Sequence, residues 1–374
     1  MDLLVLSEVR WGYFRTRKQF LLSRFPARWR VFFAQPPAAG GDDPWEPRQE
    51  GNVTYFTVPF LKPATKSAPY NLVAATPWGR GAIELAAEWH LHRQLRRLGV
   101  ERPDAVLVSN IYAPGLLSRL RPKLLLYDFN DDPFQFSGTP AWARSYWPRT
   151  VSQAEVVTVV SEYYRRRLAA EVRSPLILLG NGVEAKHFGT SAPEPPELAA
   201  LPRPLIGYVG LLSHFLDFEV LEALRRNRQG GTLVFIGPGT PATDGPMREL
   251  ASREGVAVLG PRPYADLPGY LQPLDVGVIP FRAGDPFVQG INPNKVYQYL
   301  AAGLPVVTTP VLDLVPSPPH LAFASTPEQM VAAVHFALSS DDEPAKRRAL
   351  AAAHDWDALA ARLVAEIEAR LPAA

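Results

Sequence analysis

The sequence contains no cysteine, which excludes a disulfide framework and any metal site built on thiolates. It also has no apolar run near the roughly 20 residues that a helix needs to cross a bilayer. The first residues include the acidic Asp2 and lack a basic stretch ahead of a long apolar segment, so they do not read as a signal peptide. We therefore expect a cytoplasmic protein.

Net charge is also nearly absent. The 374 residues include 39 Lys and Arg against 37 Asp and Glu, a balance of +2, so no global field favours a nucleic-acid partner. A Gly-x-Gly-x-x-Gly fingerprint is missing, which argues against a dehydrogenase. Hydrophobic residues make up 47% and charged residues 20% of the chain, as in soluble globular proteins, and the length suggests two to three domains.

Basic residues are concentrated near the start of the chain. Between Arg10 and Arg30 they alternate with Trp, Tyr and Phe, a composition that suits an anionic membrane surface. Trp11, Arg15 and Arg17 are the residues that we expect to contact a membrane or an acceptor anchored in one. An amphipathic first helix with a solvated basic face explains the same pattern equally well.

Apolar, β-branched runs alternate with helical patterns along the chain. The predicted strands are residues 3–8, 29–35, 52–60, 104–110, 124–130, 155–161, 176–181, 205–210, 232–237, 256–260, 276–281 and 306–309. The predicted helices are residues 16–25, 81–98, 140–153, 162–172, 217–226, 246–254, 264–271, 293–302, 327–338 and 356–371. Such alternation predicts doubly wound, Rossmann-like α/β domains, which bind ligands beyond the carboxyl ends of their strands.

Five prolines between residues 190 and 204 mark the best linker. We therefore predict an N-terminal domain over 1–189, a linker over 190–204 and a C-terminal domain over 205–353. The helical end, 354–374, is expected to pack back toward the N-terminal domain. The cleft between the two domains is the default site for a ligand.

The stretch NPNKVYQYLAAGLPVVTT, residues 292–309, predicts a short helix followed by a buried strand. Pro293 fits the first helical turn, and Gly303 ends the helix. Lys295 and Gln298 fall on one face by their spacing. A lysine and an amide at the positive end of a helix suit a diphosphate, whereas an ordinary helix with a solvated Lys295 is the alternative.

Five further segments stand in order along the chain: YDFNDDPFQFSG (127–138), VVSEYYRRRL (159–168), LLGNGVEAKHF (178–188), IGYVGLLSHFLDFEVL (206–221) and VLGPRPYADLPGYLQPLDVGVIPF (258–281). Together with NPNKVYQYLAAGLPVVTT, they resemble GT-B-fold glycosyltransferases, close to glycosyltransferase family four. The loop LLSHFLDF resembles the teichuronic-acid type of these enzymes. The resemblance implies two Rossmann-like domains facing a central cleft, and a transferase of cell-surface polysaccharide assembly that uses a nucleotide-sugar.

The resemblance also assigns the donor site to the C-terminal half. A leaving diphosphate needs positive charge as it departs, which Lys295 and Arg282 would supply. Phe281 either flanks the base or belongs to the core, and Gly210 either admits a phosphate to the backbone or simply turns the chain. The expected donor-binding residues are Gly210, Phe281, Arg282, Asn294, Lys295 and Gln298, with Gly237 and Pro238 as weaker candidates.

Two departures from the family pattern concern the mechanism. The paired glutamates of the family would fall at Gly290 and Gln298, and Gln298 carries no charge. The spacing from Lys295 to Gln298 is similar to that in the inverting glucuronosyltransferase of xanthan assembly. The usual Arg and Lys after the first C-terminal strand are replaced by a loop that holds His214 and Asp217. Donor identity and anomeric outcome stay open.

The acceptor is expected at the N-terminal domain and is a glycan or a lipid-linked sugar. An inverting reaction needs a base near the attacking hydroxyl. Asp131 is our first candidate and Asp128 the second, because both lie near the end of a predicted buried strand. The alternative for these residues is a turn or a helix cap. A retaining enzyme would need no such base.

No metal site is evident, because the one Asp-x-Asp pattern, Asp355-Trp356-Asp357, is better explained as a helix cap. We therefore predict a metal-independent enzyme that needs no cofactor and uses a nucleotide-sugar as its substrate. Two other hypotheses remain. One is a nucleotide-sugar epimerase, which shares this architecture. The other is a two-lobed small-molecule binding protein that has no catalytic activity.

Overall fold

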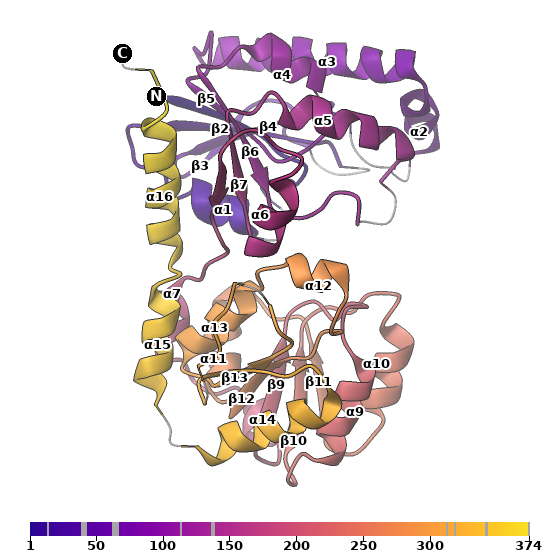
Figure 1. The fold of residues 1–374 in the computed structure, drawn as a ribbon, viewed down its shortest axis with the longest axis vertical. Helices are drawn as coiled ribbons and strands as arrows, with labels where there is room; N and C mark the ends of the chain where they lie inside the picture. The colour runs from indigo at the N-terminus through magenta and orange to yellow at the C-terminus, as the bar shows by residue number, and fades with distance from the viewer. Residues whose placement is uncertain are drawn as a thin grey trace. The chain divides into compact units, whose positions relative to one another are not determined.

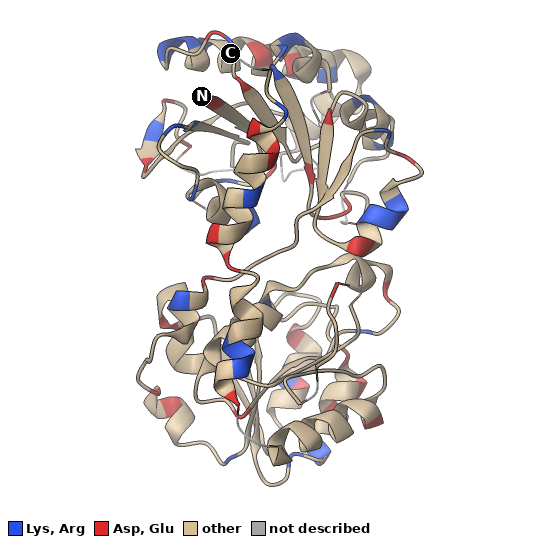
Figure 2. Cartoon of the chain, turned by 60° about the vertical axis from the view of Figure 1, so that its left-hand side comes forward, with Lys and Arg blue, Asp and Glu red and all other residues tan. Residues whose placement is uncertain are grey.

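The computed structural model describes residues 1–12, 15–38, 43–61, 67–112, 114–135, 139–311, 313–317, 319–340 and 343–372. The chain divides into two compact units (Figure 1). Unit 1 comprises Met1–Gly180 and Trp356–Ala374, and unit 2 comprises Asn181–Asp355. Each unit is a sheet with helices packed on it, and acidic and basic residues are interspersed over both (Figure 2).

Unit 1 contains, within its described residues, an eight-stranded sheet in the order β3-β4-β2-β1-β5-β6-β7-β8. All neighbours are parallel except β3 and β4. The strands are β1 (Asp2–Leu6), β2 (Arg30–Gln35), β3 (Arg48–Glu50), β4 (Val53–Thr57), β5 (Ala105–Val108), β6 (Leu124–Phe129), β7 (Val156–Val159) and β8 (Leu176–Leu178). Strand order reverses between β1 and β5, and such a reversal opens a crevice at the carboxyl ends.

Helices surround this sheet, and most of them bury apolar side chains against the core. They are α1 (Arg17–Leu22), α2 (Ala68–Ala75), α3 (Pro77–Arg97), α4 (Pro114–Leu120), η1 (Ala141–Ser145), α5 (Tyr146–Val151), α6 (Glu162–Leu168) and α16 (Trp356–Glu368). The start of α3 shows the local rule: the Thr76 hydroxyl accepts a hydrogen bond from the Gly79 N–H, and Pro77 takes the first turn. Ala87, Leu91 and Leu95 then face the core.

The C-terminal helix α16 belongs to unit 1. Trp356 stacks on Phe20 of α1 with ring centroids 5.3 Å apart. Near its other end, Glu368 accepts hydrogen bonds from Arg28 and from the indole N–H of Trp29. The last helix therefore completes the domain with which the chain begins.

Unit 2 has, in its described part, a six-stranded parallel sheet in the order β11-β10-β9-β12-β13-β14. The strands are β9 (Leu205–Val209), β10 (Thr232–Ile236), β11 (Val256–Gly260), β12 (Val276–Ile279), β13 (Val306–Thr308) and β14 (Leu321–Phe323). Here strand order reverses between β9 and β12. Their carboxyl ends are the expected ligand position in this unit.

The helices of unit 2 are α7 (Ala185–Gly189), α8 (Pro196–Ala199), α9 (Phe218–Arg226), α10 (Asp244–Ala251), η2 (Tyr264–Asp266), α11 (Leu267–Leu271), α12 (Pro286–Gly290), α13 (Asn294–Ala302), α14 (Pro327–Ser339) and α15 (Pro344–Ala352). Helix α13 ends at Gly303, which adopts the left-handed conformation with φ of 95°. The predicted helix of residues 293–302 therefore differs from the structure by one residue at its start.

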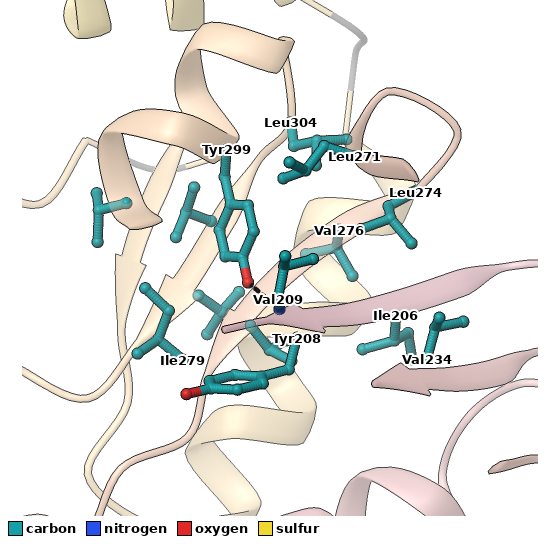
Figure 3. Close-up of a cluster of buried hydrophobic side chains, with 14 of the residues drawn as sticks. Ile206, Tyr208, Val209, Val234, Leu271, Leu274, Val276, Ile279, Tyr299 and Leu304 are labelled. Atoms are coloured by element: carbon teal, nitrogen blue, oxygen red, sulfur yellow. Dashed lines mark hydrogen bonds between the residues drawn. The ribbon is translucent and has the colours of Figure 1, made fainter. Parts of the chain in front are cut away.

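Tyr299 fastens α13 to the sheet. Its hydroxyl accepts a hydrogen bond of 2.7 Å from the Val209 N–H, at the end of β9 (Figure 3). The ring fits because β12 has a glycine beneath it: a Cβ on Gly277 would lie 2.5 Å from the ring. Pairing between β9 and β12 stops at Gly207. The Tyr299 hydroxyl therefore gives the Val209 N–H the acceptor that β12 does not provide.

The predicted linker and domain boundary are wrong. The division falls between Gly180 and Asn181, because the proline-rich segment packs on unit 2. The Ala192 N–H donates to Gln272, Leu198 of α8 is fully buried, and Arg203 pairs with Asp275. Proline count alone does not reveal these contacts.

Short elements also escaped prediction, namely β3, β14, α2, α4, α7, α8, α12 and α15. They span three to nine residues, too few turns or alternations to give a clear period. The long buried strands were predicted correctly to within two or three residues at their ends.

We expect Tyr299→Phe to destabilise unit 2 by about 1–3 kcal/mol, because it leaves the buried Val209 N–H without an acceptor. Urea unfolding followed by circular dichroism measures this loss, because all eight tryptophans lie in unit 1 and their fluorescence would not report on unit 2. Tyr146→Phe is the matched control, since the Tyr146 hydroxyl has no hydrogen bond to another residue that the structure describes. Equal stability of the two variants would contradict the anchoring role.

Candidate functional site

A lysine ammonium lies at the carboxyl ends of β9 and β12. Lys295, in the first turn of α13, donates a hydrogen bond of 2.8 Å to the Tyr208 hydroxyl of β9. Its Nζ lies 4.5 Å from the centroid of the Tyr208 ring and 5.0 Å from that of the Phe281 ring. Both rings present their electron-rich faces to the cation. The strand reversal of unit 2 therefore holds a positive charge.

No carboxylate balances this charge among the residues that the structure describes. Burial lowers the pKa of Lys295 to about 7, because the ammonium loses water without gaining an anion. The residue nevertheless keeps part of its side chain accessible. An incoming anion would supply the missing partner and restore the charged form.

Glycines make room for the lysine. Gly210 follows β9 with φ of 139°, and a Cβ there would lie 3.0 Å from Lys295 Nζ. Gly237 follows β10, and a Cβ on it would lie 2.0 Å from the Gly210 carbonyl oxygen. The Gly210 N–H already donates to the Ile236 carbonyl oxygen at 2.8 Å, which favours the interpretation of Gly210 as a turn over that of a backbone contact to phosphate. Gly210 instead allows close packing.

Phe281 is a core residue. It is 7% exposed, and its ring packs against that of Tyr208 with centroids 6.3 Å apart. The Thr309 hydroxyl donates to its carbonyl oxygen at 2.6 Å. Of the two interpretations of Phe281, the structure favours core packing, because a buried ring leaves no face for a nucleobase.

Three further predicted donor-site residues lie on α13 or ahead of it in the chain. Arg282 is exposed, directly after Phe281, and forms no ion pair within the described chain. Asn294 and Gln298 are partly buried and lie four residues apart on α13, and their side chains form no hydrogen bond to another described residue. The helix start adds its own partial positive charge. Cationic and amide donors without internal partners are therefore available near Lys295.

The corresponding strand ends in unit 1 carry a buried ion pair. Asp128 is 4% exposed; its oxygens accept a hydrogen bond of 2.7 Å from Thr158 and one of 3.3 Å from Arg17. Burial acts to raise the pKa of Asp128, but the charge of Arg17 and the Thr158 hydrogen bond outweigh it and the pKa is lowered. Such a pair is structural, and the prediction of Asp128 as a base is not supported.

Asp131 has the opposite environment. It follows β6, accepts a hydrogen bond of 2.6 Å from Asn130, and has no ion pair among the described residues. Burial raises the pKa of Asp131 to about 6, with Lys18 counteracting and Glu8 and Asp128 adding to the rise. A carboxylate with this pKa is well suited to accept a proton near neutral pH. Asp132 instead pairs with Arg167 at 2.6 Å.

Three residues at this edge were missed by the sequence analysis. Glu8 follows β1, Ser109 follows β5, and Lys18 lies on α1. Lys18 and Ser109 both donate to Glu8, each at 2.5 Å. Glu8 and Ser109 follow the two strands, β1 and β5, between which the strand order reverses. Their place could have identified them as candidates, but only once the strand order was known.

The basic and aromatic segment of residues 10–30 is not the surface stripe that its composition suggests. Trp11 and Arg17 are each 5% exposed. The Trp11 indole donates to Glu50 at 3.0 Å, and Arg17 binds Asp128. Neither a solvated basic face nor a membrane contact fits these two side chains. Arg15 is exposed, and Tyr13 and Phe14 lie outside the described residues.

Sequence comparison finds a family resemblance in the C-terminal half of the chain. Residues 203–340 match the model described as glycosyl transferases group 1. TuaH of Bacillus subtilis, named for glycosyl transfer in teichuronic acid biosynthesis, is 27% identical over 223 residues. That match spans 56% of this chain and 56% of TuaH, so the chain spans about half of this curated relative.

Solved structures show the same two-domain fold over nearly the whole chain. Sucrose-phosphate synthase from Thermosynechococcus elongatus superimposes with a TM-score of 0.73, 16% identity and 98% coverage of both chains. HepE of Anabaena in complex with UDP-glucose gives a TM-score of 0.65, 15% identity and coverage of 99% and 100%. Residues 203–340, which match the group 1 model, are thus part of a GT-B fold, as the resemblance implied.

Two features of the described residues bear on membranes and metals. None of the helices found there is both long and apolar enough to span a bilayer. Within the same residues no three or more His, Asp or Glu side chains are grouped as metal ligands. The prediction of a metal-independent enzyme remains untested.

We expect Lys295→Met to stabilise the protein below pH 7 by about 1–2 kcal/mol, since one unit of pKa corresponds to about 1.4 kcal/mol and the side chain is partly accessible. The unfolded chain binds more protons than the folded one between pH about 7 and 10.5, so wild-type stability rises with pH there. The advantage of the variant should shrink across that window. Urea unfolding at several pH values measures it, and an advantage independent of pH would contradict the desolvated cation.

Proposed function

We propose that the protein is a metal-independent glycosyltransferase that moves a sugar from a nucleoside diphosphate donor to a glycan or lipid-linked acceptor in cell-surface polysaccharide assembly. The observation that carries this proposal is Lys295, a desolvated ammonium without a counterion at the strand reversal of a group 1 domain. The names of TuaH and of the UDP-glucose complex of HepE support the same class of reaction.

The donor diphosphate would bind at the start of α13. As the bond between the sugar and the diphosphate breaks, negative charge develops on the leaving oxygen, and preorganised positive charge lowers that barrier. Lys295 supplies a full charge when protonated, Arg282 a second, and the α13 N-terminus a partial one. Asn294 and Gln298 would donate amide hydrogen bonds to diphosphate or ribose oxygens.

The acceptor would bind at the polar edge of unit 1, beside Asp131. If the reaction inverts the sugar, Asp131 accepts the proton of the acceptor hydroxyl as that oxygen attacks the anomeric carbon. The Glu8, Lys18 and Ser109 cluster supplies further hydrogen-bonding groups at the same edge. The intracellular location stays a prediction from the sequence.

Lys295→Ala should weaken binding of UDP or another nucleoside diphosphate by about 10- to 100-fold, the range for losing a hydrogen bond to a charged group. A thermal-shift panel of nucleotides and nucleotide-sugars identifies the ligand, and calorimetry then measures affinity. Lys346→Ala, an exposed lysine of the same unit, is the control. If no nucleoside diphosphate stabilises the wild-type protein, the donor site is wrong.

Diphosphate binding should take up protons above pH about 7, because the anion raises the pKa of Lys295 from its lowered value. Affinity should therefore fall as pH rises above that value. Calorimetry in buffers of different ionisation enthalpy measures the uptake directly. An uptake that persists in Lys295→Ala would show that another group takes the proton.

Asp131→Asn should reduce turnover by about 10²- to 10⁴-fold, the usual contribution of a general base, while leaving donor affinity unchanged. Wild-type turnover should rise with pH through about 6, as Asp131 loses its proton, and the variant should lack this rise. Full activity of Asp131→Asn would favour a retaining reaction. Turnover of the donor without an acceptor would favour the epimerase alternative.

A further inference from the structure

Helix α3 has two apolar faces, and only one of them is buried. Ala87, Leu91 and Leu95 pack into the core of unit 1. On the other side, Trp78 is 91% exposed and Trp89 61% exposed. In Figure 1, α3 runs along the upper margin of unit 1.

The exposed apolar side chains form a continuous stripe. Trp78, Leu85 and Trp89 are spaced by seven and four residues, which places them on one side of the helix over about 16 Å. Leu72 and Val73 of the adjoining α2 are 74% and 46% exposed and add to it. Single exposed apolar residues are common, but a row that includes two tryptophans marks an interaction surface.

Arginines continue the stripe toward the end of α3. Arg93 and Arg96 are exposed and form no ion pair within the described chain. The Arg93 guanidinium lies 5.6 Å from the Trp89 ring centroid, so a cation accompanies the apolar row.

Few acidic residues accompany these cations. Outside the two helices, the exposed Glu101 lines the same surface hollow as Trp89 and Arg96. Glu46 pairs with Arg97 and also interacts electrostatically with Arg93. The acids of α2 and α3 are Glu84, which is buried, and Glu88, which pairs with Arg119 at 2.6 Å. The described part of these two helices thus presents no unpaired carboxylate to solvent. The surface of these helices is apolar and cationic, without the mixed charges of an ordinary solvated helix.

We propose that this α2–α3 face, composed of Leu72, Val73, Trp78, Leu85, Trp89, Arg93 and Arg96, docks on an anionic lipid bilayer. Tryptophan rings favour the level of the lipid headgroups, and leucine and valine enter the acyl boundary. The arginines attract anionic headgroups. A second copy of the chain fits less well, because the same face on the partner would offer the two arginines only the carboxylate of Glu101 as an exposed acid without an ion pair among the described residues.

The docking face is distinct from the segment of residues 10–30 in which the sequence suggested membrane contact. Trp11 and Arg17 of that segment are buried in unit 1, whereas Trp78 and Trp89 project into solvent. Docking by α2–α3 would hold whether or not the protein transfers sugar, and it would bring a transferase to a lipid-linked acceptor.

Cosedimentation of the full chain with vesicles tests the proposal. We expect binding to an equal mixture of phosphatidylcholine and phosphatidylglycerol, and weaker binding to phosphatidylcholine alone. The double variant Trp78→Ala/Trp89→Ala should bind the mixed vesicles at least about tenfold more weakly. Arg93→Gln and Arg96→Gln should each reduce binding about fivefold, with a smaller dependence on salt.

Phe336→Ala is the matched control, because Phe336 is a large apolar residue of unit 2 that is 53% exposed outside the stripe. Circular dichroism establishes that each variant is folded. Absence of vesicle binding, or binding that the tryptophan and arginine variants leave unchanged, would overturn the proposal. So would self-association of the lipid-free chain that the tryptophan variant abolishes, since it would assign the face to a second copy.

Discussion

The proposed donor site depends on one uncompensated charge. Lys295 Nζ lies over the rings of Tyr208 and Phe281, and none of the described carboxylates pairs with it. Keeping a cation there costs stability, and the surrounding structure sustains it: Tyr299 fastens α13 to β9, and Gly210 leaves space beside the ammonium. A diphosphate would relieve this cost on binding. The energy stored in the desolvated lysine is thereby available for recognition of the donor.

The charges at the two strand reversals are arranged in opposite ways. In unit 2 the strand ends keep a cation without an anionic partner among the described residues. In unit 1 most charges at the strand ends are paired internally, Arg17 with Asp128 and Lys18 with Glu8. Of the described residues at that edge, Asp131 is the exception, and its raised pKa follows from burial without a cation in contact. One group at each reversal is thus left ready for chemistry, the lysine toward an anion and the aspartate toward a proton.

Prediction worked where burial on both faces makes a strand apolar throughout, as in β5, β6, β9 and β12. It also placed Lys295 correctly in the first turn of a helix, because the Gly303 stop is a local signal. It failed for the domain boundary and for the segment of residues 10–30. The composition of these segments does not tell whether the prolines of 190–204, or the cations Arg17 and Lys18, lie in solvent or are packed inside. Only the residues that they contact distinguish an exposed from a buried position.

The sequence by itself determined the two α/β domains and the helix that presents Lys295 beyond the strand ends, because these follow from hydrophobic period and from caps read over neighbouring residues. Tertiary structure decided which predicted groups are available. It buried Phe281, occupied the Gly210 N–H and paired Asp128 with Arg17. These outcomes depend on contacts between residues far apart in the chain, as does the solvent exposure of Trp78 and Trp89, and a linear pattern does not encode them.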